Sequence, residues 1–125
     1  MQSIKSYTDI EQSRKLAEIL PLESADMYRV FENNAETRVY YGKAPTAHFV
    51  CEPCWSVAAL MDIFPDEITD DGDVYRNMSF HLKGKYIIQY PRLTTLWPSL
   101  LSVEADNYVD ACCQMVLKLH ELNLL

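Results

Sequence analysis

The chain has little of what several large functional classes require. Three of its 125 residues are glycine. A glycine-rich loop that cradles phosphates needs more, so nucleotide hydrolysis of the P-loop type is excluded. Lysine and arginine number 11 against 18 aspartates and glutamates, giving a net charge of −7, and the sequence contains no basic cluster. A protein that binds duplexes needs a basic face to neutralise phosphates, so we expect no direct nucleic-acid partner.

Long hydrophobic runs are also absent from the sequence. The longest, Val57–Phe64, is interrupted by Asp62 and is far too short to span a bilayer. The first residues contain no apolar stretch of the kind found in signal peptides, so we expect a cytoplasmic protein with no membrane partner. Cysteines stay reduced in that compartment. The four cysteines are Cys51, Cys54, Cys112 and Cys113.

What the sequence does contain is the composition of an ordinary globular domain. Hydrophobic residues make up 49% of the chain and charged residues 23%, both close to the average for globular proteins. A chain of this length is the size of one domain and can bury a core without a metal ion or a disulfide. We therefore expect residues 1–125 to form a single domain.

Hydrophobic periodicity predicts helices in the first half of the chain. A capping box that begins at Thr8 introduces the first of them, over Asp9–Leu20. The second is predicted over Pro53–Phe64, because proline fits the first turn of a helix. This second helix is apolar on nearly every side, so we expect it at the centre of the core, with Trp55 and Leu60 buried.

A last helix is predicted at the C-terminal end. Asp106 or Asn107 is a suitable N-cap for it. Cys112 and Cys113 fall on its apolar stripe, where cysteine usually behaves as a small hydrophobic residue. We expect both thiols to be buried, reduced and free of metal.

Alternating and β-branched segments predict strands between these helices. They occupy Met27–Glu32, Thr37–Tyr41, Val74–Leu82, Tyr86–Tyr90 and Leu100–Ala105. The predicted order is α-β-β-α-β-β-β-α. Short connections favour one antiparallel sheet of about five strands with the three helices mainly on one face, which is the α+β class.

A sheet covered on one face leaves its other face for water or for a partner. Along Val74–Leu82 the apolar residues alternate with Tyr75, Asn77, Ser79 and His81, and we predict that this second set is exposed. A surface of Tyr, His and Asn is typical of a protein-binding face, and a second copy of the chain is the simplest partner. The candidate binding residues are Tyr75, His81, Tyr86, Tyr90 and Trp97, with the acidic segment Asp66–Asp73 as a solvated loop at the rim.

The sharpest local motif is Cys51-Glu52-Pro53-Cys54. At a helix start, the two thiols would lie where the helix N-terminus lowers the pKa of a cysteine. The motif resembles the C-x-P-C redox site of the thioredoxin family, and the resemblance implies Cys51 as nucleophile and Cys54 as resolving thiol. A zinc site formed by His48, Cys51 and Cys54 is another alternative, although zinc needs four ligands. The third interpretation is two ordinary thiols.

Taken end to end, the sequence resembles small uncharacterised proteins of phages and mobile elements of Bacteroides-type gut bacteria. The resemblance rests on Tyr7–Ser13 with Glu23–Tyr28, on Pro53–Ser56, and on Asp110–Cys112 with Leu117–Glu121. It implies a mobile-element context and no known activity. The sequence therefore favours a non-enzymatic protein-binding module without a cofactor, with thiol-disulfide or zinc-dependent activity at Cys51 and Cys54 as the alternative.

Overall fold

The structure is a computed structural model that describes residues 5–31, 38–43 and 50–125. Within these ranges it contains three α-helices, one 3-10 turn and eight strands, which confirms the α+β class. The helical elements are α1 (Ile10–Ala17), η1 (Leu22–Ser24), α2 (Val57–Ile63) and α3 (Tyr108–Glu121). The strands are β1 (Met27–Phe31), β2 (Arg38–Tyr41), β3 (Val50–Cys54), β4 (Glu67–Asp70), β5 (Asp73–Arg76), β6 (Met78–Leu82), β7 (Lys85–Pro91) and β8 (Ser99–Ala105).

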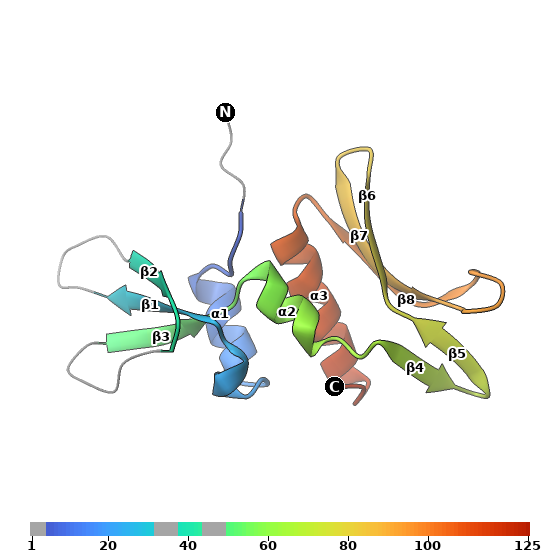
Figure 1. The fold of residues 1–125 in the computed structure, drawn as a ribbon, viewed down its shortest axis with the longest axis horizontal. Coiled ribbons are helices and arrows are strands. Elements are labelled where there is room, and N and C mark those ends of the chain that lie inside the picture. Colours follow the sequence, from blue (N-terminus) through green and yellow to red (C-terminus); the bar gives the residue numbers. More distant parts are fainter. Residues whose placement is uncertain (1–4, 32–37, 44–49) are drawn as a thin grey trace.

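The strands form three small antiparallel sheets, in the orders β2-β1-β3, β4-β5 and β6-β7-β8. The prediction of one sheet of about five strands is therefore wrong. The early strands pair among themselves, and so do the late ones, because α2 separates the two groups along the chain. Figure 1 shows β1–β3 with α1 at one end of the molecule, α2 and α3 in the middle, and β6–β8 at the other end.

The second predicted helix begins four residues later than its sequence suggests. Pro53 lies in β3, and α2 starts at Val57 with the Ser56 side chain accepting a hydrogen bond from the Ala59 backbone N–H. The prediction of a helix over Pro53–Phe64 is thus wrong for its first turn. Because β3 is at the edge of its sheet, the N–H that proline lacks needs no partner strand.

The predicted acidic loop is a hairpin instead. β4 and β5 pair in register across a two-residue turn at Asp71 and Gly72, both of which have positive φ. Asp-Gly is the preferred sequence of such a turn, and this local signal outweighs the charge of the segment. The extended strand structure is interrupted at Asn77. The single strand predicted over Val74–Leu82 is therefore two strands, β5 and β6.

Hydrogen bonds join α1 and the residue Lys5 before it to α3, which is far away in the sequence. The cap of α1 is Asp9, one residue after the predicted Thr8, and the predicted cap Asn107 begins α3. The Asp110 carboxylate of α3 accepts hydrogen bonds from Lys5 and Gln12 at 2.8 Å each. Partial burial opposes the charge of Asp110, but these bonds and a third from Asn107 hold its pKa below the usual range.

A single cluster of buried side chains connects the three helices to the β4–β5 hairpin and to the β6-β7-β8 sheet. Trp55 and Leu60 are fully buried within it, as predicted. Cys112 and Cys113 are also buried, and burial raises the pKa of each thiol to about 12. Further members are Leu16, Phe64, Ile88, Tyr90, Val103, Val109, Met115, Val116 and Leu119.

Candidate functional site

The two cysteines of the C-x-P-C motif lie in a strand, and the prediction that they start a helix is wrong. Residues three apart in a strand point to opposite faces and lie roughly 10 Å apart, beyond the Cα separation of about 7 Å that a disulfide tolerates. Cys54 is fully buried, while Cys51 is half-buried. His48 lies outside the described residues. Within the described ranges, no three His, Cys, Asp or Glu side chains gather in a way that suits a metal ion.

The hydrogen bonds around Cys54 hold neighbouring elements of the fold together. The neighbouring Arg29 side chain of β1 is only 4% exposed and donates hydrogen bonds to the Thr8 carbonyl at 2.7 Å and the Ser13 hydroxyl at 3.3 Å. Its guanidinium also lies 3.8 Å from the Cys54 sulfur. The Thr8 hydroxyl in turn accepts the Trp55 backbone N–H. These bonds join α1 to β1 and β3, and all four residues, Thr8, Ser13, Arg29 and Cys54, are buried.

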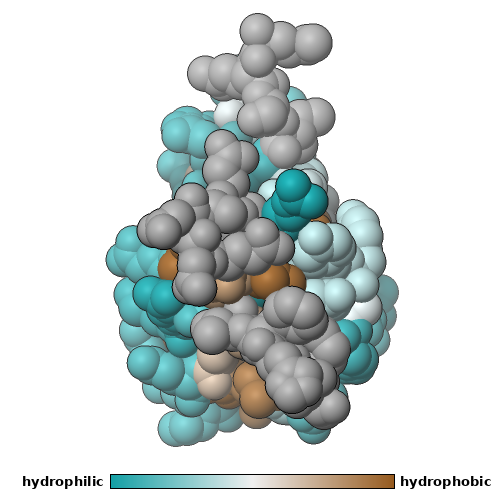
Figure 2. Space-filling view, turned by 90° about the vertical axis from the view of Figure 1, so that its left-hand side faces the viewer, coloured by the Kyte–Doolittle hydropathy of each residue, from teal (hydrophilic) through white to brown (hydrophobic). Residues whose placement is uncertain are grey.

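Sequence analysis did not identify Arg29 as a buried residue. Its position could have predicted its burial, because Arg29 comes two residues after buried Met27 and therefore lies on the same face of the strand. Cys51 is on the other face and lines a groove of about 370 Å³ together with Pro53 and Lys43. Figure 2 shows this end of the molecule as mostly hydrophilic, with hydrophobic residues gathered near its centre.

Two of the predicted binding residues lie in the interior. Tyr75 and Tyr90 are buried, so the prediction that they are exposed is wrong. The Tyr90 hydroxyl donates a 2.7 Å hydrogen bond to the Pro65 carbonyl, and burial raises the pKa of Tyr90 to about 12. Neither side chain is available to a partner in the folded chain.

The other predicted binding residues are accessible to different degrees. Tyr86 is half-buried and packs edge-to-face on Tyr108 of α3, with ring centroids 4.4 Å apart. His81 is exposed and stacks on Tyr86 at 4.3 Å. Trp97 is 76% exposed in the connection between β7 and β8. The Tyr86 side of this sheet is therefore the side that α3 covers, and the prediction of an exposed face is wrong for its tyrosines. Ser79 and His81, at the edge of the sheet, are exposed as predicted.

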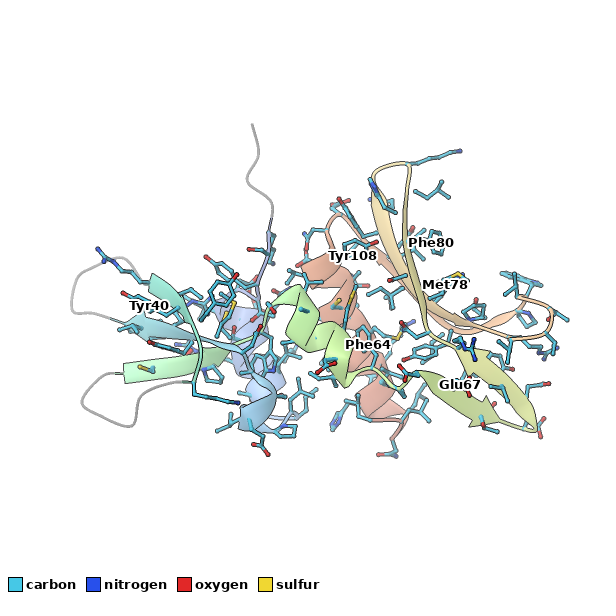
Figure 3. The ribbon with its side chains drawn as sticks, viewed as in Figure 1. Tyr40, Phe64, Glu67, Met78, Phe80 and Tyr108 are labelled. Carbon is cyan, nitrogen blue, oxygen red and sulfur yellow. The ribbon has the colours of Figure 1, made fainter. Side chains whose placement is uncertain are left out.

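The face turned away from α3 carries an apolar patch at its β6 edge. In β6 it presents Met78, Phe80 and Leu82, and Phe80 lies directly opposite Ile87 of β7. We call these four residues the outer stripe. Met78 and Leu82 are 39% and 54% exposed. Figure 3 shows Met78 and Phe80 on the side of β6 away from Tyr108 and α3.

The apolar residues of β6 point away from α3 because of how the sheet packs on the helix. β6 is at the edge of its sheet, and most of its residues are exposed. The helix α3 packs on the neighbouring strands instead, through fully buried Ile88 of β7 and buried Val103 of β8. The β6–β7 hairpin extends beyond that contact (Figure 1), so its apolar residues are not drawn into the core.

The surroundings of the outer stripe combine apolar and acidic groups. The connection between β7 and β8 exposes Leu93, Leu96 and Trp97. At the same end of β6, the Asn77 backbone N–H donates a hydrogen bond to the Asp66 carbonyl at 3.0 Å. This bond places the acidic β4–β5 hairpin next to the start of β6. The candidate functional surface is thus an apolar sheet face with an acidic end.

A cavity of about 420 Å³ lies between the two ends of the molecule and is lined in part by Tyr41, Tyr86 and Tyr108. Its charged groups are already used within the chain: Lys5 pairs with Asp110, and Asp26 accepts hydrogen bonds from the Ser56 backbone and hydroxyl. The cavity therefore has no charged group free to select a ligand among the described residues.

Comparisons with known proteins add no further assignment. In the part of the chain that the structure describes, no helix is long and apolar enough to cross a membrane. No protein-family model matches the sequence, and no curated protein or solved structure is detectably similar to it.

Proposed function

We propose that the chain is a non-enzymatic protein-binding module of the cytoplasm that binds through the outer stripe of β6 and β7. The observation that carries this proposal is the apolar patch that Met78, Phe80, Leu82 and Ile87 form on the outer sheet face, at its β6 edge. Sheet faces without a covering layer are normally polar, because their residues alternate hydrophobic-in and polar-out. In β6 the alternation is reversed, whereas β7 and β8 keep polar residues such as Gln89 and Glu104 on this outer face. Exposed apolar patches mark interaction sites.

Other features support a protein partner over a small substrate. The outer stripe is a surface rather than an enclosed cavity, and exposed Trp97 lies in the connection that follows β7. Tryptophan and methionine are enriched at protein interfaces. The resemblance to small phage and mobile-element proteins is the support for a mobile-element setting, and the four cysteines, all free thiols, suit a reducing compartment.

The positions of Cys51 and Cys54 do not favour thiol-disulfide exchange between them. A thiol-disulfide exchange requires both sulfurs to meet and one of them to be accessible. The strand places the two side chains on opposite faces, and Cys54 is fully buried.

The binding surface can be tested by site-specific photo-crosslinking. A photoreactive amino acid replaces Met78 of the outer stripe, and in a matched control it replaces Lys15, an exposed residue of α1. Irradiation in cells that express the chain naturally should give a discrete protein adduct from position 78 and none from position 15. Equal labelling from both positions, or no adduct from position 78, would refute the proposal.

A further inference from the structure

The edge of β6 lacks the features that usually prevent strand pairing. Its five residues, Met78–Leu82, include no proline and none of Asp, Glu, Lys or Arg. Its pairing with β7 is regular along the whole strand, so no bulge twists the edge away. Natural proteins blunt free edges with charges, prolines or bulges, because an unprotected edge pairs with another strand. The β6 edge is therefore open to such a strand.

The sequence of β6 is symmetric in character about its central residue. Met78 and Leu82 at the ends are apolar, Ser79 and His81 are polar, and Phe80 is in the middle. An antiparallel partner with this same sequence would place Phe80 opposite Phe80 of the second copy. Every apolar residue would then face an apolar one and every polar residue a polar one, and facing pairs of matched character stabilise antiparallel strands.

Charge is complementary at both ends of the same arrangement. Beyond the paired strands, the same two-fold axis places exposed Lys83 in the turn of one copy near Asn77 of the other, and Asn77 is bonded through its backbone to exposed Asp66. Within the described residues neither Lys83 nor Asp66 takes part in an ion pair. A two-fold axis brings this positive and negative pair together twice, although each copy carries a net charge of −7.

We propose that β6 pairs antiparallel with β6 of a second copy of the chain, centred on Phe80, so that the two β6-β7-β8 sheets join into one continuous sheet. The contact is isologous, as in most homodimers, because the same strand is used by both copies. The inference goes beyond the proposed function, because it uses the free edge of β6 and leaves the outer stripe on one face of the joined sheet.

A charge exchange at the two-fold axis tests this register. Wild-type chain should sediment with a mass that rises with concentration from 14.5 kDa to twice that value. Phe80→Glu and Phe80→Lys each place like charges opposite each other, so each variant alone should self-associate at least about tenfold more weakly. An equal mixture of the two variants should restore the dimer, since Glu then faces Lys. Only a contact in which residue 80 meets its own copy produces this pattern.

The control is Leu22→Glu, which charges an apolar side chain that is 61% exposed in η1, in the half of the chain that does not contain β6. It should leave the association unchanged, and circular dichroism should show that all three variants are folded. A wild-type chain that stays monomeric up to about 1 mM, where even weak association is visible, would overturn the inference. So would a dimer that neither substitution at Phe80 weakens, or variants whose mixture fails to associate. If the chain is monomeric but position 78 crosslinks a different protein, the proposed function stands and the self-pairing does not.

Discussion

Neighbouring isoleucines in β7 give a direct test of which sheet face is covered. Ile88 is fully buried against the core, whereas Ile87 lies on the outer stripe and is half-buried. Both positions carry the same residue type in the same strand, so substitution by alanine removes the same atoms at each, and the cost depends on how those atoms pack. Any difference between the two variants therefore measures packing.

The magnitudes follow from the two environments. Ile88→Ala removes buried atoms and leaves a cavity that the surrounding core fills only partly, which costs about 2–5 kcal/mol in the free energy of unfolding. Ile87→Ala opens no enclosed cavity, so its cost should be about 1 kcal/mol or less. If Ile88 is the residue that faces the core, Ile88→Ala should therefore lower the free energy of unfolding by at least about 1 kcal/mol more than Ile87→Ala does.

Urea titration at low chain concentration measures both values, with the fluorescence of buried Trp55 as the reporter. The low concentration keeps any self-association from protecting Ile87. Equal m-values for the two variants would confirm that the difference is one of stability. A cost for Ile87→Ala that equals or exceeds the cost for Ile88→Ala would show that the apolar face of β6 is the covered one, and the proposed binding surface would be refuted.

Three further predictions concern the core and the helix contacts. Tyr90→Phe should lower the free energy of unfolding by about 1–2 kcal/mol, since the Pro65 carbonyl loses its partner; an unchanged urea midpoint would contradict the buried hydrogen bond. Cys112 and Cys113 should resist a thiol reagent in the native chain and react in denaturant, because burial raises the pKa of both to about 12; rapid native labelling would show that the stripe of α3 is open. The pKa of Asp110 is lower in the folded chain than in the unfolded one, so its stabilisation is complete above the unfolded value of about 4 and is lost as the pH falls through the folded value. Asp110→Asn should therefore melt at a lower temperature at neutral pH but lose less stability on acidification, and parallel melting curves for variant and wild type would argue against this role.

Much of the fold was predictable because its signals are local. Asn107 caps α3 as its sequence indicates, and the β6–β7 turn at Lys83 and Gly84 has the positive φ values that such a hairpin requires. The α+β class follows from the same kind of information. Helix caps and turn residues act within four positions of the chain, so they are readable without knowledge of the tertiary structure.

Errors of prediction arose where a local signal had two possible structures. Pro53 suits the first turn of a helix and also an edge strand, and the pairing of β3 with β1 decided for the strand. That pairing also separates Cys51 from Cys54 and removes the geometric basis of the redox interpretation. Arg29 is buried for a similar reason, because Thr8 and Ser13 of a distant segment supply its hydrogen bonds.

The sequence by itself determined the alternation of β6, with Met78, Phe80 and Leu82 on one face and Ser79 and His81 on the other. It did not determine which face looks inward, because a period of two is symmetric between the faces of a sheet. Only the tertiary structure decided this. The helix α3 packs on β7 and β8, whose buried residues fix the phase of the sheet, and β6 at the edge follows that phase with its apolar side outward.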